Sequence, residues 1–578
     1  MSKVSATTTA IARFKESGIP VIEPKEPTYR DYEKAVVTSN LLYRFTRPPC
    51  VLKPETTEHV QKIVQQARSA KVPLTIRCGG HSYAGHSTAI EKDTLLVDLR
   101  SMNSVQLDMK TKVVTVGAGC QWGEVYRSLI EGGHDGWVVN GGRCPYVGVG
   151  GYILGGGLAP FGRSFGMGSD TLLEATIVTA DGKIVVVGEK DRKDSNEGRL
   201  FWALRGAGSG NFGVVTQMKL KVMPLSTRNA GKVMGGRFNW AFSEVKKKAD
   251  GSPKAADENA QDEEQTTAQL LSTMNKFYKT EWPDRLTMDS MWVCNLRANV
   301  PDIVSFNVYF DGTPKEFEKL IDDNIETKDV SKELKRRILP EPSTRFLYET
   351  LEAQWYDESK KFFAEDKTYR IFTSFCFDRA TISNSVDKLT AKCKERMAAF
   401  RNKFTGDNVQ MDITWIHAGG QTSKAKKATD TAFYWRETVY HCYVEVLWKD
   451  KWMEMAMRRF MYKLKEEFRP FSLGGEAAFI NFPDRNLDPN EYERAYFGEN
   501  RHELRRIKEI WDKDNYFKWQ QQIKLPKDVT EKGSNVNGPT DENDTDAVAR
   551  KQWTPYLWKH HASEDAAAEL ANLWEMES

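Results

Sequence analysis

Two glycine-rich stretches constrain this chain more than any other feature of its sequence. Residues 77–85 read RCGGHSYAG, and residues 141–157 read GGRCPYVGVGGYILGGG. Each stretch surrounds one nucleophilic side chain, His81 or Cys144, with glycines. Glycine adopts positive φ and lets the backbone approach a ligand closely, and successive N–H groups in such loops bind anions such as a pyrophosphate. The two stretches therefore predict loops around one large polar ligand, to which both side chains can be bonded covalently.

Length and charge limit the class of protein. The chain has 578 residues, with 83 basic against 80 acidic side chains and a formal net charge of +3. This length predicts two or three domains, and the balanced charge argues against a nucleic-acid partner. No segment approaches the roughly 18 uninterrupted apolar residues of a membrane span, and residues 1–15 lack the apolar run of a signal peptide. We therefore expect a cytoplasmic protein.

The spacing of cysteine and histidine residues bears on the compartment of the protein and on metal binding. The eight cysteines are widely spaced and contain no CxxC pair, which argues against a disulfide scaffold and favours reduced thiols. His560 and His561 are adjacent, but no carboxylate or cysteine set with ligand spacing accompanies them. No metal site is expected.

In residues 51–225, helix signals and strand signals alternate. Thr56 or Thr57 can cap a helix with apolar residues at helical spacing. A strand ending at Ile76 leads directly into the His81 loop, and the Asp181–Gly182 pair indicates a hairpin between two β-rich runs.

The pattern changes after residue 225. Residues 246–267 are polar and low in complexity and are typical of an exposed, flexible insertion. From about 285 to 470, β-rich runs alternate with charged amphipathic helices, which predicts an antiparallel sheet covered by helices. Residues 526–550 have the composition of a polar linker, and the aromatic tail 553–574 is expected to dock on the body.

Two further glycine motifs match known fingerprints but lie in the wrong context. Residues 208–213 fit GxGxxG, yet a helix signal precedes them and a strand signal follows, the reverse of a nicotinamide-binding fingerprint. Residues 162–166 fit GxSxG without the strand before and helix after that a nucleophile elbow requires. We therefore interpret Ser164 as non-nucleophilic.

Together the two glycine-rich stretches resemble the paired flavin-attachment motifs of berberine-bridge-enzyme-like oxidases, in the vanillyl-alcohol-oxidase superfamily. The resemblance extends to residues 172–182, 201–216, 496–500 and 514–517. It implies an α+β fold with an FAD-binding domain built from both chain ends and a central substrate domain whose antiparallel sheet is covered by helices. The implied segments are 1–225 for the N-terminal part of the FAD-binding domain, 226–473 for the substrate domain, 474–525 for the C-terminal return, and 526–578 for the linker and tail.

The same resemblance implies the cofactor contacts. His81 should be linked to the flavin 8α-methyl group and Cys144 to flavin C6. The residues expected to surround the pyrophosphate and the ring edge are Arg77, Gly79, Gly80, Ser82, Tyr83 and Gly85. Further FAD-lining positions are Gly142, Val147, Gly148, Gly150, Gly151, Gly156, Gly213, Val215 and Asn515.

Val147 lies three residues after Cys144, at the position said to control oxygen access in this family. A small valine favours an oxidase that reduces O₂ to H₂O₂, whereas a valine packed only for volume carries no such meaning. A dehydrogenase with another acceptor and a flavin-binding protein without catalysis remain alternatives. The substrate is expected to be a small organic molecule, and sugars, secondary-metabolite alcohols, phenols and alkaloid-like molecules all remain open.

The catalytic base departs from the family pattern. Many relatives carry an Asn–Tyr pair before the C-terminal return, but here Asn481 is followed by Phe482, which cannot accept a proton. Strand alternation in residues 439–448 places the next candidates, His441, Tyr443 and Glu445, on one face. By the resemblance, His441 matches a substrate-facing Glu of several relatives, and a histidine has the pKa range suited to general-base catalysis. A polar strand face that simply meets solvent is the competing interpretation.

Overall fold

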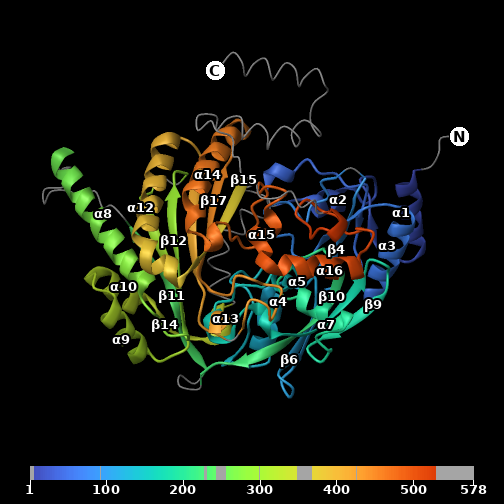
Figure 1. Ribbon diagram of the computed structural model, residues 1–578, viewed down its shortest axis with the longest axis horizontal. Coiled ribbons are helices and arrows are strands. Elements are labelled where there is room, and N and C mark those ends of the chain that lie inside the picture. Colours follow the sequence, from blue (N-terminus) through green and yellow to red (C-terminus); the bar gives the residue numbers. More distant parts are fainter. Residues whose placement is uncertain are drawn as a thin grey trace, which may run out of the picture.

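The computed structural model describes residues 5–38, 40–91, 93–226, 231–241, 256–297, 300–347, 368–424 and 426–528 (Figure 1). Within these ranges the chain builds three sheets. Short 3₁₀ helices connect many of the elements: η1 (Leu41–Tyr43), η2 (Leu99–Ser101), η3 (Gly168–Thr171), η5 (Lys451–Met453), η6 (Arg469–Phe471), η7 (Leu473–Gly475), η8 (Gly498–Asn500) and η9 (Pro526–Asp528).

The first sheet positions the His81 loop. Its strand order is β1 (Val21–Ile22), β2 (Val51–Leu52), β4 (Leu95–Asp98) and β3 (Leu74–Arg77), with β2, β4 and β3 parallel. Helices α1 (Ala6–Glu16), α2 (Tyr29–Val36) and α3 (Thr57–Ser69) accompany it. The Thr56 hydroxyl caps α3, and the apolar stripe of that helix is fully buried, as its spacing predicts. Strand β3 then delivers the chain into the first glycine-rich loop.

The second sheet is antiparallel and carries the second glycine-rich stretch. Its main order is β5 (Val105–Asp108), β6 (Val113–Gly117), β10 (Gly213–Pro224), β8 (Leu172–Thr179) and β9 (Ile184–Gly188), and β7 (Trp137–Val139) also pairs with β10. The predicted hairpin at Asp181–Gly182 joins β8 to β9. The accompanying helices are α4 (Trp122–Glu131), α5 (Val149–Leu154), α6 (Gly162–Phe165) and α7 (Asn196–Ala203).

Two helices near the end of the described chain return to this part of the molecule. Figure 1 shows α15 (Tyr492–Phe497) and α16 (Arg501–Trp511) beside α5, α7 and β10. Their buried side chains Tyr496, Leu504 and Ile507 belong to the same hydrophobic cluster as Leu200 of α7.

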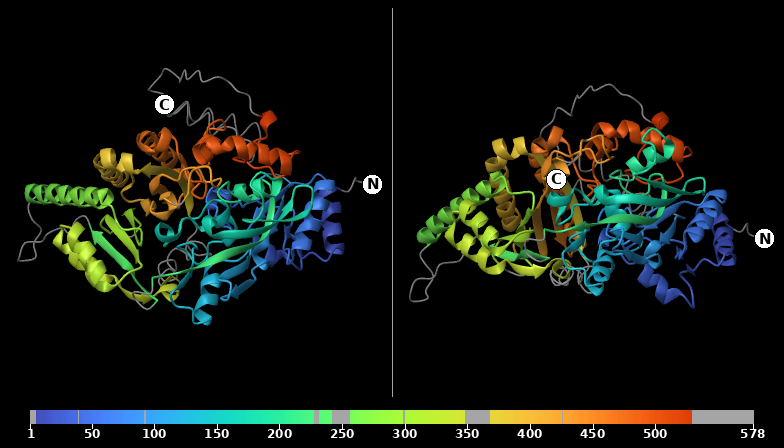
Figure 2. Two further views of the ribbon diagram at one scale, coloured as in Figure 1. Left: turned by 60° about the horizontal axis from the view of Figure 1, so that its bottom comes forward. Right: turned by 90° about the horizontal axis from the view of Figure 1, so that it is seen from below.

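The third sheet has seven strands, and every pairing in it is antiparallel. The order is β14 (Leu339–Pro342), β11 (Lys232–Ala241), β13 (Ile303–Phe310), β12 (Leu286–Asn295), β16 (Val409–His417), β17 (Thr438–Trp448) and β15 (Tyr369–Asp378). Helices α8 (Ala256–Lys279), α12 (Arg379–Phe404) and α14 (Glu454–Phe468) cover one face (Figures 1 and 2). The remaining helices are α9 (Pro314–Asn324), α10 (Lys328–Arg337) and α13 (Gln421–Lys424). The predicted helix-covered antiparallel sheet is confirmed.

The sequence predicts a flexible insertion over residues 246–267, of which residues 246–255 lie outside the described part of the chain. From Ala256 onward the chain forms helix α8. The C-terminal half of α8 buries Leu270, Met274 and Phe277 against the seven-stranded sheet. Once that half is helical, each further residue adds a hydrogen bond without a new nucleation cost, so the helix extends into the polar sequence before it.

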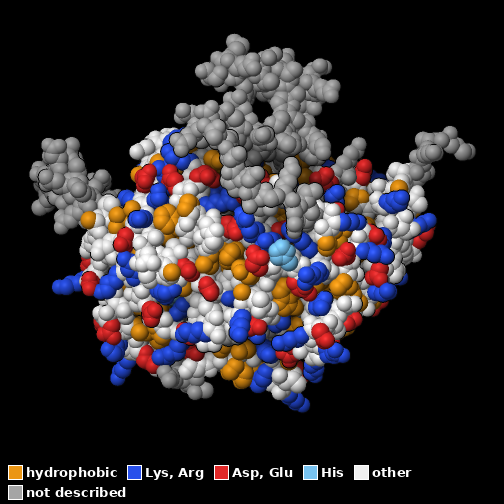
Figure 3. Space-filling view, in the orientation of Figure 1, with side chains coloured by type: hydrophobic (Ala, Val, Ile, Leu, Met, Phe, Trp, Pro, Cys, Tyr) orange, Lys and Arg blue, Asp and Glu red, His pale blue; other side chains and the backbone are white. Residues whose placement is uncertain are grey.

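The segment boundaries proposed from the sequence stay a prediction, and residues 529–578, with the expected docking tail, lie outside the described part. Among the described residues, no helix is both long and apolar enough to cross a membrane. On the face drawn in Figure 3, basic and acidic side chains are interspersed.

Candidate active site

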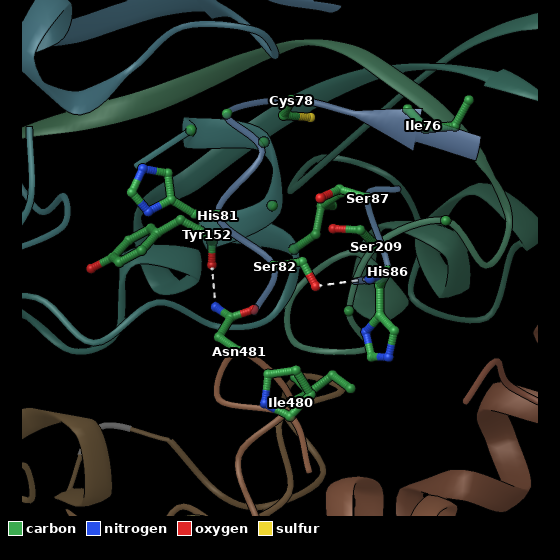
Figure 4. Close-up of a pocket in the computed structure, with 18 of the residues that line it drawn as sticks. Ile76, Cys78, His81, Ser82, His86, Ser87, Tyr152, Ser209, Ile480 and Asn481 are labelled. Atoms are coloured by element: carbon green, nitrogen blue, oxygen red, sulfur yellow. Dashed lines mark hydrogen bonds between the residues drawn. The ribbon is translucent and has the colours of Figure 1, made fainter. Parts of the chain in front are cut away.

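A cavity of about 320 Å³ lies where segments from both ends of the described chain meet. Its wall comes from β3 and the loop after it, from the second glycine-rich stretch, and from the turn before β10. The third sheet contributes Ile416 and Tyr443, and the C-terminal part contributes residues 479–483 and 517–519. Figure 4 shows the C-terminal loop with Ile480 and Asn481 facing the loop that carries His81.

His81 and Cys144 both line this cavity, although 63 positions separate them in the sequence (144 − 81). Burial, with the Arg370 guanidinium nearby, lowers the pKa of His81 to about 4. The imidazole is therefore neutral at neutral pH and has a nucleophilic nitrogen. Cys144 is buried and forms no disulfide. The structure thus brings the two nucleophiles of the glycine-rich stretches to one site.

The glycines bring the two loops into direct backbone contact. A Cβ added to Gly79 would lie 2.4 Å from the Gly148 nitrogen, and a Cβ on Gly148 would lie 2.3 Å from the Gly79 nitrogen. A Cβ on Gly150 would lie 2.7 Å from the Cys78 Sγ atom. No larger residue fits at these three positions without moving backbone or a buried side chain.

Other glycines leave room for a ligand. A Cβ on Gly151 would meet only the Ser209 hydroxyl, at 3.8 Å. A Cβ on Gly210 would meet only the Trp519 indole nitrogen, at 3.9 Å. Both residues line the cavity, so the space beside them is open.

Hydroxyl groups line the middle of the cavity. Ser82, Ser87 and Ser209 lie between the Ile76 end and the His81 end in Figure 4. The Ser82 hydroxyl accepts a hydrogen bond from the His86 backbone N–H at 3.1 Å. A cavity with a hydroxyl- and glycine-lined middle and two nucleophiles fits FAD, whose adenine and flavin rings flank a pyrophosphate.

Four residues expected at the cofactor lie behind the cavity wall. Arg77 is buried and donates to Asp98 Oδ2 at 2.8 Å and to the Ala35 carbonyl at 2.5 Å, so its guanidinium supports β3 and β4. Gly85 and Gly156 have φ of 77° and 111°, and a Cβ on either would strike a neighbouring side chain, Tyr43 or Met167. Asn515 adopts a φ of 53° in the turn before the lining residues 517–519.

The remaining residues expected to contact the cofactor all line the cavity. They are Gly79, Gly80, His81, Ser82, Tyr83, Gly142, Cys144, Val147, Gly148, Gly150, Gly151, Gly213 and Val215.

The three candidate bases on β17 have different environments. Tyr443 lines the cavity, and its ring stacks on Phe482 at 4.4 Å between ring centres. Glu445 lies 3.1 Å from Arg370 in a buried ion pair, and Arg370 lies over the Tyr83 ring. The Glu445 carboxylate is therefore already used to neutralise a buried guanidinium.

His441, predicted from the sequence to face the substrate, is not among the residues that line the cavity. Its ring lies 5.1 Å from that of Phe479, which does line the cavity, and its Nδ1 atom lies 3.6 Å from Cys376 Sγ. Burial lowers the pKa of His441 to about 3, and the Arg143 guanidinium acts in the same direction. A base this weak, behind an aromatic ring, is poorly placed to take a substrate proton.

The sequence patterns did not indicate every residue that lines the cavity. Arg143 and Tyr152 belong to the second glycine-rich stretch, so their place in that motif was an available signal. Phe479 lies two residues before Asn481 in the loop that lacks the usual tyrosine. Ile416 and Leu158 carry no sequence signal, because only the packing of β16 and the glycine-rich loop against the cavity places them there.

The loop that carries Phe482 is held by a side chain of β15. The Ser374 hydroxyl accepts from the Phe479 N–H at 3.0 Å and donates to the Phe482 carbonyl at 2.9 Å. Asn481 donates to the Tyr152 carbonyl at 3.0 Å (Figure 4). Hydrogen bonds to β15 and to the second glycine-rich stretch therefore hold the loop so that Phe482 packs against Tyr443.

Comparison with known proteins agrees with this geometry. The family described as "FAD binding domain" matches residues 48–188, and the family described as "Berberine and berberine like" matches residues 478–524. Over 519 residues the chain is 26% identical to monolignol oxidoreductase AtBBE-like 13 of Arabidopsis thaliana, covering 82% of this chain and 84% of that protein.

Solved structures share the fold. Berberine bridge enzyme from Eschscholzia californica matches with a TM-score of 0.72 at 20% identity, covering 89% of this chain and 99% of that chain. Wild-type Phl p 4.0202, described as a glucose dehydrogenase, matches with a TM-score of 0.70 at 19% identity, with the same coverage. A Phl p 4 variant with one isoleucine-to-valine substitution, described as a glucose oxidase, matches with a TM-score of 0.70 at 20% identity and that coverage too. The residues of both family matches contribute to the wall of one cavity, and this chain is an FAD-linked oxidoreductase that is similar to the berberine-bridge-enzyme-like proteins.

Proposed function

We propose that this oxidoreductase is an oxidase with a bicovalently attached FAD. It converts an alcohol, or an equivalent activated C–H group, into the carbonyl product and passes the two electrons and two protons to O₂, which leaves as H₂O₂. Bound FAD supplies the hydride acceptor and the site of oxygen reduction. The protein holds the cofactor, orients the substrate and takes up the substrate proton.

The observation that carries this proposal is that His81 and Cys144 line the same cavity. A neutral imidazole and a buried thiol are both able to bond to an electrophilic ring held between them. We assign His81 to the flavin 8α-methyl group and Cys144 to flavin C6. Each attachment removes one hydrogen from the side chain and one from the cofactor, and O₂ takes up these two electrons and two protons as H₂O₂.

The first prediction concerns these bonds. Acid precipitation of the purified protein should leave a yellow pellet, because covalent flavin stays with the polypeptide. The single variants His81→Ala and Cys144→Ala should each keep the flavin in the pellet through the other bond, whereas the double variant should release free FAD. Ser209→Ala, which alters the same cavity without removing a nucleophile, is the control and should behave like the parent. Free FAD released from the unmutated protein would contradict bicovalent attachment.

Val147 supports oxygen as the acceptor. Its side chain lines the cavity three residues after Cys144, in a turn in which Val147 N–H donates to the Cys144 carbonyl at 3.3 Å. The Trp122 N–H donates to the Val147 carbonyl at 3.1 Å, so the turn is held in place. The Phl p 4 variant described as a glucose oxidase also differs from its parent by the introduction of a valine.

The second prediction tests this role. Val147→Leu should slow reoxidation of the dithionite-reduced protein in air by about tenfold, or about 1.4 kcal/mol in barrier, because the larger side chain narrows the approach to the ring. Val147→Ala should reoxidise at least as fast as the parent. Stopped-flow absorbance of the returning flavin band measures both rates. Equal rates for the leucine and valine proteins would place the oxygen path elsewhere, and slow reoxidation of the parent would favour a dehydrogenase.

For the proton, we assign the receiving group to Tyr443, which takes it up as the phenolate. It is the one of the three candidates on β17 that lines the cavity, whereas Glu445 is paired with Arg370 and His441 lies behind Phe479. Phe482, where many relatives carry a tyrosine, packs against the Tyr443 ring. In this chain β17 therefore supplies the phenol group of the site, in place of the C-terminal loop.

A further inference from the structure

Residues 479–484, which we call the edge loop, cross the edge of the seven-stranded sheet. β15 is the last strand in the order of that sheet, and successive residues of a strand point to opposite faces. Ser374 pairs with Tyr443 and therefore shares its cavity face, whereas the next side chain, Thr373, points to the face that the helices cover. Ser374 binds the edge loop on the cavity face. The Thr373 hydroxyl binds it on the helix-covered face, where it donates to Asp484 Oδ2 at 3.0 Å.

On the helix-covered face, Asp484 holds the end of the edge loop. Its side chain is 3% exposed, and its Oδ2 atom lies 3.2 Å from the Lys465 Nζ atom of α14. The Lys465 side chain is itself only 9% exposed. The other carboxylate oxygen of Asp484 accepts the Asn486 N–H at 2.8 Å. A buried carboxylate needs a cation and hydrogen bonds to offset its lost hydration, so Lys465 and Thr373 together fix where Asp484 lies.

The backbone of Asp484 connects the edge loop to the C-terminal part of the chain. Its N–H donates to the Tyr496 hydroxyl at 3.1 Å, and its carbonyl accepts from the Gln521 side-chain amide at 2.7 Å. Tyr496 is buried on α15, and Gln521 lies two residues after Trp519, which lines the cavity. Asp484 therefore joins α14 and β15 to the C-terminal segment beside the cavity.

Phe482 has little freedom between these anchors. Its carbonyl accepts from Ser374, and Asp484 follows two residues later, after Pro483, whose ring fixes φ. The Phe482 ring stacks on Tyr443 with 4.4 Å between the ring centres. A displacement of Asp484 therefore moves Phe482 relative to Tyr443. In an active site, a misplacement of about 1 Å can cost about 10²-fold in rate.

We propose that Lys465 is a positioning residue for the oxidation. Its ion pair with Asp484 sets the place of the Phe482 ring against Tyr443. Lys465 lies on the helix-covered side of the sheet and is not among the residues that line the cavity. It acts through the edge loop and contacts neither cofactor nor substrate. The proposal rests on the oxidase function above, in which Tyr443 receives the substrate proton.

The placement can be measured without a substrate. Replacement of Phe482 by 4-fluorophenylalanine gives one fluorine resonance that reports on the surroundings of this ring. Lys465→Met should shift or broaden this resonance, because the edge loop loses its cation on the helix-covered face. Lys465→Arg, which keeps the charge, should leave it near the parental position. Lys463→Met should do the same, because Lys463 is exposed on the same helix. An unchanged resonance in the Lys465→Met protein would overturn the proposal.

The rate of flavin reduction tests the effect on the site. Lys465→Met should slow anaerobic bleaching of the flavin at saturating alcohol by about ten- to a hundredfold. The probes are cinnamyl alcohol and glucose, of which the one that bleaches the parent is used. The covalent flavin of the acid pellet should be unchanged, because His81 and Cys144 stay in place. Lys465→Arg should recover most of the rate, and Lys463→Met should keep it.

A double-mutant cycle separates positioning from a general loss of stability. Phe482→Leu removes the ring through which Lys465 acts, so Lys465→Met should slow the Phe482→Leu protein by no more than about twofold. A general loosening would slow both proteins by the same factor, and equal factors would overturn the proposal. If Lys465→Met does not fold, Thr373→Val takes its place in both measurements. That change keeps the side-chain shape and removes the hydroxyl that binds the same Asp484 oxygen.

Reaction with oxygen separates this proposal from the function on which it rests. Reoxidation of the dithionite-reduced parent needs no substrate, and flavin reduction is measured without O₂. If the parent reoxidises slowly but Lys465→Met gives the expected resonance and cycle, the oxidase function fails and the role of Lys465 stands. If the parent reoxidises promptly and Lys465→Met reduces its flavin at the parental rate, the oxidase function stands and the role of Lys465 is overturned. Where neither alcohol bleaches the parent, the fluorine resonance decides the role of Lys465 by itself.

Discussion

Tyr443→Phe should lower the rate of flavin reduction by about 10²- to 10⁴-fold, the usual contribution of a positioned general base. The change removes only the hydroxyl, so the ring should keep its stack on Phe482 at 4.4 Å and its contact with Phe372. Affinity for a non-reacting alcohol should therefore change little while the chemical step slows. Anaerobic stopped-flow bleaching with an alcohol that reduces the parent measures the rate, and calorimetry measures the affinity.

Tyr440→Phe is a matched control for this experiment. Tyr440 lies on the same strand but on the opposite face, stacked on His417 in the core under the covering helices. Its hydroxyl is buried and has no hydrogen-bond partner in the structure, so its removal should affect neither the rate nor the folding. A Tyr443→Phe protein that reduces its flavin at the parental rate would remove Tyr443 from the proton transfer.

Lys508→Met should cause a large loss of stability. The Lys508 ammonium is fully buried on α16 and donates to Asp512 at 2.6 Å and to the carbonyls of Asn211 and Phe517 at 2.7 and 2.9 Å. The Asp512 carboxylate in turn accepts from the N–H groups of Tyr516 and Phe517. This buried pair therefore ties the turn before β10 to the segment that supplies the lining residues 517–519.

Methionine matches the length of lysine but leaves the Asp512 carboxylate buried without a cation. Breaking a buried ion pair from one side costs about 3–5 kcal/mol, a large part of the roughly 5–15 kcal/mol that stabilises a domain. We expect the urea concentration at the midpoint of unfolding to fall clearly for the FAD-binding part of the molecule. Tryptophan fluorescence measures this midpoint.

Lys424→Met provides the control for that measurement. Lys424 pairs with Asp284, but its side chain is 66% exposed, and exposed pairs contribute at most about 1 kcal/mol. Its midpoint should stay close to that of the parent. If the Lys508→Met protein is as stable as the Lys424→Met protein, the buried Lys508–Asp512 ion pair does not contribute to stability.

Much of the fold could be predicted from the sequence because its signals are local. The stripe of α3, its Thr56 cap and the hairpin at Asp181–Gly182 each depend on neighbours within a few residues. The antiparallel sheet follows from β-rich runs that alternate with amphipathic helices. The start of α8 could not be predicted, because its polar residues are helical only as the extension of a half that packs on distant strands.

At the site, the sequence by itself determined that His81 and Cys144 lie in loops shaped for a large cofactor, because the glycines that permit close backbone contact surround each of them. Only the tertiary structure decided which side chain of β17 lines the cavity. Alternation places His441, Tyr443 and Glu445 on one face, but Phe479 covers the first and Arg370, 75 positions from Glu445, neutralises the last. Strand periodicity sets the direction of a side chain, whereas burial and charge depend on residues that only folding brings near.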